Sequence, residues 1–93
     1  MKYPIFIELG GRRAVIVGGG QVALRKAQKL LDAGARVAVI AEHVDTALEI
    51  IAQQNEKLEL VKGPYSPEYL AETTLAIAAT NNSQVNKQVY HDC

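Results

Sequence analysis

A short apolar run that ends in three glycines constrains this chain more than any other feature. Ala14-Val15-Ile16-Val17 precedes Gly18-Gly19-Gly20, and a helix-like pattern begins at Gln21. The segment Gly18-x-Gly20-x-x-Ala23 matches G-x-G-x-x-G/A, the fingerprint of a strand–turn–helix that binds a dinucleotide. In such a turn the first glycine permits the tight bend, the second lets a pyrophosphate approach the backbone, and the small third residue packs helix on strand.

The same glycine triplet would also suit a flexible turn that binds nothing. Its context favours the dinucleotide interpretation, because an apolar strand precedes it and an amphipathic helix over about Gln21–Ala33 follows. Gly34 then suits a left-handed cap at the end of that helix. Phosphates would lie at the start of the helix, near its free N–H groups and the positive end of its dipole.

The rest of the chain alternates strand and helix patterns. Apolar runs predict further strands, amphipathic runs predict helices, and Ser66–Leu70 predicts a short capped turn. We expect strands at Arg36–Ile40, Leu58–Val61 and Thr74–Ala79, with the last buried on both faces, and helices at Asp45 to about Gln54 and from about Gln84. The fold class is therefore α/β: a Rossmann-like, doubly wound parallel sheet of about four strands with flanking helices, incomplete as such sheets go.

Polar residues follow the predicted second strand. Glu42 lies 24 residues after Gly18, slightly beyond the position at which dinucleotide folds place an acid on the adenosine ribose. It serves that role or is an exposed loop acid, and both interpretations stay open. His43 would act as a base or, as is more common, is an exposed loop histidine. Because no arginine follows this strand to receive a 2′-phosphate, the sequence favours NAD over NADP.

Other residues have two interpretations each. Thr80-Asn81-Asn82 ends the predicted fourth strand and should face the glycine loop, although capping of the next helix is compatible with that. Tyr65 or Tyr69 would stack on a ring ligand or, as we rather expect, pack on the core. Two basic pairs, Arg12-Arg13 and Arg25-Lys26, would contact anions or, again the more common case, face solvent.

Composition excludes several classes. Lys+Arg and Asp+Glu number 10 each, so the zero net charge argues against nucleic-acid binding. The single Cys93 allows no intrachain disulfide and fits a reducing, cytoplasmic location. The start of the chain lacks a signal-peptide pattern, and no apolar run approaches the roughly 20 residues that span a bilayer. With 93 residues, the chain should form one small domain, 1–93.

Several segments together resemble the N-terminal domain of siroheme synthase, the precorrin-2 dehydrogenase family. They are Pro4-Ile5-Phe6, Val15-Ile16-Val17-Gly18-Gly19-Gly20-x-Val22-Ala23-x-Arg25-Lys26-Ala27, Leu31-x-Ala33-Gly34-Ala35, Gly63-Pro64-Tyr65 and Ile77-Ala78-Ala79-Thr80-Asn81-Asn82-x-x-x-Asn86. The resemblance covers nearly the whole chain. It implies NAD-dependent oxidation of precorrin-2 to sirohydrochlorin, with iron insertion as a second activity in some members. The implied cofactor contacts are Gly18, Gly20, Gln21, Val22, Glu42, His43, Thr80 and Asn81.

The resemblance also has a limit. The family carries its assigned aspartate on a further strand, followed by a dimerisation region, and neither pattern is found here. We therefore expect the first two-thirds of a Rossmann domain, truncated at its C-terminal side, from a longer homodimeric enzyme. No catalytic residue and no metal ligand is assigned, and Asp32 and Asp45 are interpreted as helix-terminal. Alone, the chain should not oxidise precorrin-2 at a useful rate.

Two other classes stay open. One is a non-catalytic dinucleotide-binding regulatory module, which would share the Gly18 fingerprint but would not require the Thr80-Asn81-Asn82 segment. The other binds nothing and only dimerises through an unfinished sheet edge.

Overall fold

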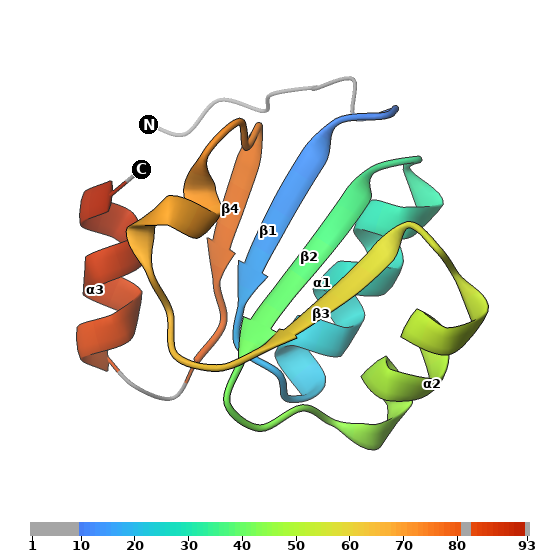
Figure 1. Cartoon of the computed structure of the whole chain (residues 1–93), viewed down its shortest axis with the longest axis horizontal. Helices are drawn as coiled ribbons and strands as arrows, with labels where there is room; N and C mark the ends of the chain where they lie inside the picture. Colours follow the sequence, from blue (N-terminus) through green and yellow to red (C-terminus); the bar gives the residue numbers. More distant parts are fainter. Residues whose placement is uncertain (1–9, 81–82, 93) are drawn as a thin grey trace, which may run out of the picture.

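The computed structural model describes residues 10–80 and 83–92. They form four strands, three α-helices and one short 3₁₀ helix, which alternate along the chain as the sequence predicts (Figure 1). In order, the elements are β1 (Arg13–Val17), α1 (Gln21–Asp32), β2 (Arg36–Ala41), α2 (Thr46–Gln54), β3 (Leu58–Lys62), η1 (Pro67–Leu70), β4 (Leu75–Ala78) and α3 (Ser83–Asp92). The predicted bounds differ from these by only one or two residues.

All neighbouring strands in the sheet are parallel, and their order is β3-β2-β1-β4. The chain moves outward from β1 to β3 and then crosses back to place β4 on the other side of β1. In register, Ile16 of β1 lies between Val39 of β2 and Ile77 of β4. Strand order therefore reverses between β1 and β4, which is where α/β sheets of this kind bind ligands. The predicted Rossmann-like fold is confirmed.

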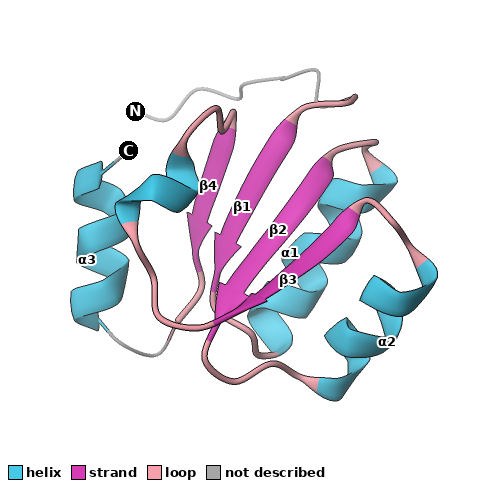
Figure 2. Ribbon diagram, in the orientation of Figure 1, coloured by secondary structure: helices cyan, strands magenta, loops and turns pink. Residues whose placement is uncertain are grey.

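Each face of the sheet has its own apolar cluster, because successive strand side chains point to opposite sides. Ile16 and Val39 belong to the cluster that α1 and α2 cover, where Ala23, Ala27 and Leu48 are buried. Val15 and Ile40 belong to the cluster on the opposite face, with Val89 of α3. Figure 2 shows these helices on the two sides of the strands, with η1 on the side of α3. Helices therefore cover both faces of β1.

Local sequence explains where the helices begin and end. Gly34 has a φ of +86° after α1, its N–H donates to the Leu31 carbonyl at 2.9 Å, and the Ala35 N–H donates to the Leu30 carbonyl at 3.0 Å. This pair of bonds is a Schellman motif, which requires the left-handed residue that glycine provides. At α2, an Asp45 carboxylate oxygen accepts from the Ala47 N–H at 2.9 Å. The expected helix-terminal roles of Gly34, Asp32 and Asp45 are confirmed.

Two expectations about burial and capping are wrong. Strand β4 is not buried on both faces: its residues are half-buried and Ala78 is exposed, because β4 is an outer strand of the described sheet and pairs only with β1. The 3₁₀ helix η1 follows Ser66 as expected, but the Ser66 side chain makes no capping bond there. The burial of β4 and the capping of η1 both depend on long-range packing, which local sequence does not determine.

Within residues 10–80 and 83–92, no helix is long and apolar enough to cross a membrane.

Candidate functional site

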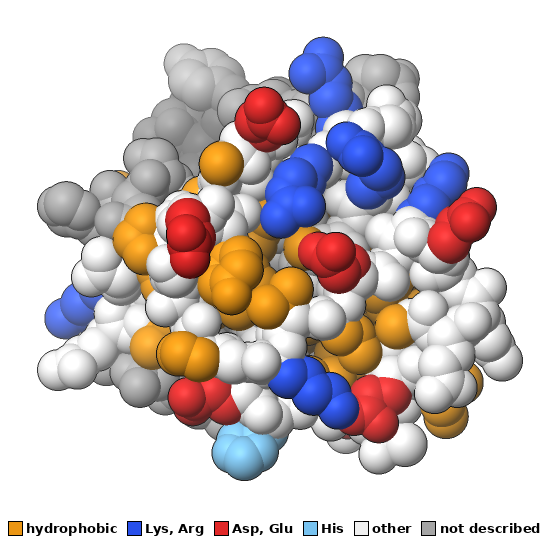
Figure 3. All heavy atoms as spheres, viewed as in Figure 1, with side chains coloured by type: hydrophobic (Ala, Val, Ile, Leu, Met, Phe, Trp, Pro, Cys, Tyr) orange, Lys and Arg blue, Asp and Glu red, His pale blue; other side chains and the backbone are white. Residues whose placement is uncertain are grey.

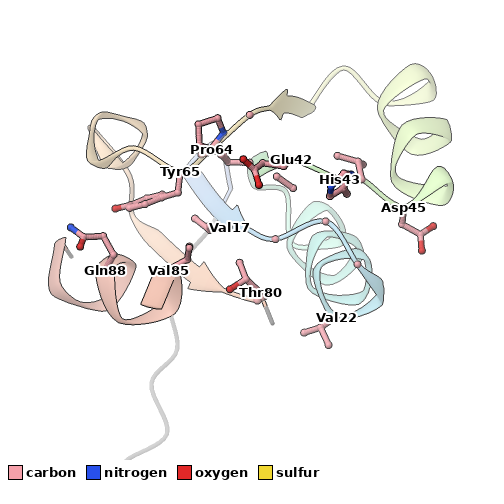
Figure 4. A pocket seen from close by; sticks show the side chains of 18 of the residues that line it. Val17, Val22, Glu42, His43, Asp45, Pro64, Tyr65, Thr80, Val85 and Gln88 are labelled. Atoms are coloured by element: carbon pink, nitrogen blue, oxygen red, sulfur yellow. The ribbon is translucent and has the colours of Figure 1, made fainter. Parts of the chain in front are cut away.

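A cleft of about 1010 Å³ opens at the carboxyl ends of the strands, over the reversal between β1 and β4. It is bounded by the glycine loop after β1, the ends of β2 and β4, the loop after β3, and α3 (Figure 4). The lining residues are Val17 to Val22, Ile40 to Asp45, Gly63 to Tyr65, Ala79, Thr80, Gln84, Val85 and Gln88. The sequence-predicted residues Gly18, Gly20, Gln21, Val22, Glu42, His43 and Thr80 are all among them.

Asn81 and Asn82 lie outside the described residues, as does Pro4-Ile5-Phe6.

The glycines divide into two that the fold needs and one that leaves space. Gly18 has a φ of +133°, and a Cβ there would overlap the Ala79 carbonyl. A Cβ at Gly19 would overlap the His43 carbonyl oxygen and lie 2.9 Å from the Ala41 Cβ. A Cβ at Gly20 would meet no atom within 4 Å. Gly18 and Gly19 therefore permit close backbone packing, whereas the position above Gly20 is open to a ligand.

Backbone hydrogen bonds fix this loop against the end of β2. The Gly18 N–H donates to the Ile40 carbonyl at 2.9 Å, and the Asp45 N–H donates to the Gly19 carbonyl at 2.7 Å. Helix α1 begins directly after the loop, with Gly20 at its N-cap, no side-chain capping bond and no acidic residue in its first turn. The first-turn N–H groups of a helix have no acceptor within the helix. They form a positive end that suits a pyrophosphate.

Beside this loop, the carboxyl end of β2 supplies two exposed polar side chains to the cleft. Glu42 and His43 both follow β2 and line the cleft, and Figure 4 shows them on the side toward α2. Asp45 lies next to them, but its carboxylate caps α2. Glu42 is therefore the acid placed to meet a ribose on this side of the glycine loop.

Opposite Glu42, the end of β4 places Thr80 against the glycine loop. The Thr80 nitrogen lies 3.2 Å from the point that a Gly18 Cβ would occupy. Asn86 of α3 holds Thr80 in place: its Oδ1 accepts from the Thr80 hydroxyl at 2.6 Å and from the Thr80 N–H at 3.3 Å, and its Nδ2 donates to the Thr80 carbonyl at 2.9 Å. The expectation that Thr80 faces the glycine loop is confirmed.

Asn86 is a positioning residue that sequence reasoning did not single out. In the sequence it stands at the end of the segment Ile77 to Asn86. The available signal was an amide side chain one turn into a helix that follows a strand-ending threonine, where an amide can satisfy both an N–H and a carbonyl.

A further wall of the cleft comes from the loop after β3 and from α3. Tyr65 is half-buried and packs in the same apolar cluster as Val85. Gln84 and Gln88 lie one helical turn apart on α3 and also line the cleft. Of the two tyrosines considered above, Tyr65 lines the cleft, whereas Tyr69 does not line it and packs against the core.

The basic residues lie away from the cleft. Arg25 and Lys26 are exposed on α1 and do not line it, as expected for a solvated face. Arg12 is exposed as well, but Arg13 is half-buried and its Nη2 donates to the Tyr69 carbonyl at 3.4 Å, so the expectation of a solvated pair is wrong for Arg13. Basic side chains gather over the amino ends of the strands (Figure 3), where a hollow of about 400 Å³ has both arginine and glutamate walls.

Charge in the cleft is therefore acidic. Of the described lining residues, Glu42 and Asp45 are acidic and none is Lys or Arg. Among residues 10–80 and 83–92, no group of three or more His, Cys, Asp and Glu side chains could hold a metal ion.

Comparison with known proteins assigns this chain to a family. Residues 5–93 match the profile of a family described as "Putative NAD(P)-binding". The chain is 44% identical over 90 residues to siroheme synthase of Chromobacterium violaceum and 48% identical over 88 residues to siroheme synthase 2 of Yersinia enterocolitica. These matches cover 97% and 95% of this chain but only 19% and 18% of the relatives.

A solved structure of a related protein has the same fold. SirC, a precorrin-2 dehydrogenase, superimposes with a TM-score of 0.88 at 29% identity, over 96% of this chain and 44% of that one. The chain thus spans about a fifth of the curated relatives and under half of the matched structure. With its profile matched over residues 5–93, this chain belongs to the family described as putative NAD(P)-binding.

Proposed function

We propose that these residues are the cofactor-binding part of an NAD-dependent precorrin-2 dehydrogenase, which oxidises precorrin-2 to sirohydrochlorin while NAD⁺ is reduced to NADH. The open position above Gly20, at the start of a helix without a side-chain cap, carries the proposal. A pyrophosphate needs such a cradle of backbone N–H groups. The likeness to siroheme synthases and to SirC supports the choice of reaction.

The residues that face the cleft have distinct roles in this proposal. The backbone of Gly20, Gln21 and Val22 holds the pyrophosphate beside Gly18. Glu42 and His43 contact the adenosine side, and Thr80 contacts the nicotinamide side. The resemblance adds Asn81, which lies outside the described residues, to the cofactor contacts. Asn86 acts through Thr80, since its three hydrogen bonds fix that residue. When bound, NAD⁺ supplies the hydride acceptor. The residues of this chain bind and orient it.

NAD should be preferred to NADP for an electrostatic reason. Glu42 is exposed at the cleft, and no Lys or Arg is among the described lining residues. A 2′-phosphate on the adenosine ribose would face a carboxylate with no cation to offset it. The hydroxyls of NAD instead offer that carboxylate two hydrogen-bond donors.

The rest of the enzyme should supply the substrate site. Precorrin-2 is a large polycarboxylate, and the described cleft offers acidic rather than basic side chains. We therefore place the groups that bind its carboxylates in the remainder of a longer protein, which acts as a homodimer. Residues 1–93 form one NAD(P)-binding Rossmann-type unit of that protein, and the single cysteine fits a cytoplasmic location.

A chimera tests the proposal. Residues of this chain replace the matched 90 residues of the Chromobacterium violaceum siroheme synthase, and NAD-dependent formation of sirohydrochlorin is followed by absorbance. We expect the chimera to retain activity within about tenfold of the parent, a barrier change of about 1.4 kcal/mol. The 93-residue chain alone should form no product at a useful rate. The aspartate that the family assigns to the reaction lies on a further strand, and positioned proton transfer is worth about 10²–10⁴-fold.

Two results would count against this proposal. A folded chimera that binds NAD but does not oxidise precorrin-2 would favour a regulatory dinucleotide-binding module. Turnover by the isolated chain equal to that of the chimera would show that the substrate site lies within these residues.

A further inference from the structure

The cleft has two ends, one on each side of the glycine loop. Since β1 lies between β2 and β4, Glu42 and His43 lie on one side of the loop, and Thr80 lies on the other with Val85 and Gln88 of α3 (Figure 4). A dinucleotide whose pyrophosphate lies at the loop must extend one nucleoside to each side. This step rests on the proposed function: if Glu42 holds the adenosine ribose, the nicotinamide lies toward β4 and α3.

One aromatic side chain reaches that second end. The loop after β3 is tied to the end of β2 by the Gly63 N–H, which donates to the Ala41 carbonyl at 3.0 Å. From there it crosses the carboxyl edge of the sheet to η1 (Figure 1), and Figure 4 shows the Tyr65 side chain extending toward α3 on the side of Gln88. Among the described lining residues, Tyr65 is the one Phe, Tyr or Trp. Tyr65 is half-buried and packs against the apolar cluster that contains Val17 and Val89, so packing restricts its ring before a ligand arrives.

We propose that Tyr65 forms one face of the nicotinamide subsite and gives the site a preference for the oxidised cofactor. The nicotinamide ring of NAD⁺ is flat and positively charged, whereas that of NADH is neutral. A cation over an aromatic face is stabilised by the ring quadrupole. Gln84 and Gln88 line the same wall of the cleft. Tyr65 therefore holds NAD⁺ for the reaction and releases NADH more readily.

The test compares three ligands by calorimetry: NAD⁺, NADH, and ADP-ribose, which lacks nicotinamide. In Tyr65→Leu we expect NAD⁺ affinity to fall by about 3- to 30-fold, ADP-ribose affinity to stay within about twofold, and NADH affinity to fall less than that of NAD⁺. Tyr65→Phe should retain most NAD⁺ affinity, because it keeps the ring. Tyr69→Leu is the matched control, since Tyr69 packs in the same apolar cluster but does not line the cleft.

Equal losses for NAD⁺ and ADP-ribose in Tyr65→Leu, or no loss for either, would overturn the proposal. If wild type binds neither ligand, the proposed function itself is wrong, which is a separate result. Should Tyr65→Leu fail to fold, the wild-type complex still decides. Nuclear Overhauser contacts between the Tyr65 ring and the nicotinamide protons are then expected, and contacts only to adenine protons would contradict the subsite.

Discussion

Alanine at Gly18 or at Gly19 should remove much of the stability of this domain, whereas alanine at Gly20 in the same loop should leave it folded. At Gly18 the φ of +133° strains any L side chain, and the added Cβ would overlap the Ala79 carbonyl. Such strain costs about 1–3 kcal/mol, and overpacking costs about 1–3 kcal/mol more. A domain of this kind has only about 5–15 kcal/mol in total.

Gly19→Ala should be similarly costly without any unusual φ, because its Cβ would overlap the His43 carbonyl oxygen and crowd Ala41. The measurement is the free energy of unfolding from urea titrations of wild type and the three alanine variants. Gly20→Ala is the matched control: it adds the same methyl group to the same loop but meets no atom within 4 Å. Equal destabilisation by all three changes would show that general flexibility, and not close packing, explains the glycines.

Valine at Gly20 should weaken NAD binding by at least about tenfold, which corresponds to about 1.4 kcal/mol, while the domain remains folded. Gly20 has an extended backbone, with φ −92° and ψ −159°, that a branched residue can adopt. The space above it contains no protein atom within 4 Å of an added Cβ. The isopropyl group would therefore occupy the place of the pyrophosphate, not that of a protein neighbour.

Calorimetry with NAD gives the affinity, and circular dichroism with urea unfolding reports the fold. A modest loss of stability, about 1 kcal/mol, is expected because valine is a poorer N-cap than glycine. Gly63→Val provides a comparison, since Gly63 also lines the cleft with no atom within 4 Å of an added Cβ. It lies after β3 and away from α1, so its effect on NAD affinity should be smaller. Unchanged NAD affinity in a folded Gly20→Val protein would mean that the glycines serve only the turn.

Much of the fold could be predicted from local sequence, because each element carries its own signal. The β-branched run before Gly18, the helix start at Asp45 and the Gly34 stop each act within a few residues, and the structure has them as expected. The reversal next to β1 followed from the parallel α/β pattern. The half-buried state of β4 could not be predicted in this way, because burial depends on which elements cover a strand.

The candidate site shows the same division. Gly18, Glu42 and Thr80 follow strands, and a parallel sheet brings the ends of its strands together. Gly19 occupies an unspecified position of the fingerprint, and its need for glycine arises from the His43 backbone, far along the chain. Likewise, the bonds from Asn86 to Thr80 and the placement of Tyr65 depend on how α3 and the loop after β3 pack. No local pattern contains that information.

The central claim is that this cleft binds NAD, with Glu42 selecting against a 2′-phosphate. Its most direct test is a pair of calorimetric titrations of the wild-type chain with NAD and with NADP at one fixed salt concentration. We expect saturable binding of one NAD per chain, tighter than that of NADP. In Glu42→Gln the difference should shrink, since the repelling charge is removed from a side chain that is exposed at the cleft. Absence of NAD binding, or tighter binding of NADP by the wild type, would contradict the claim.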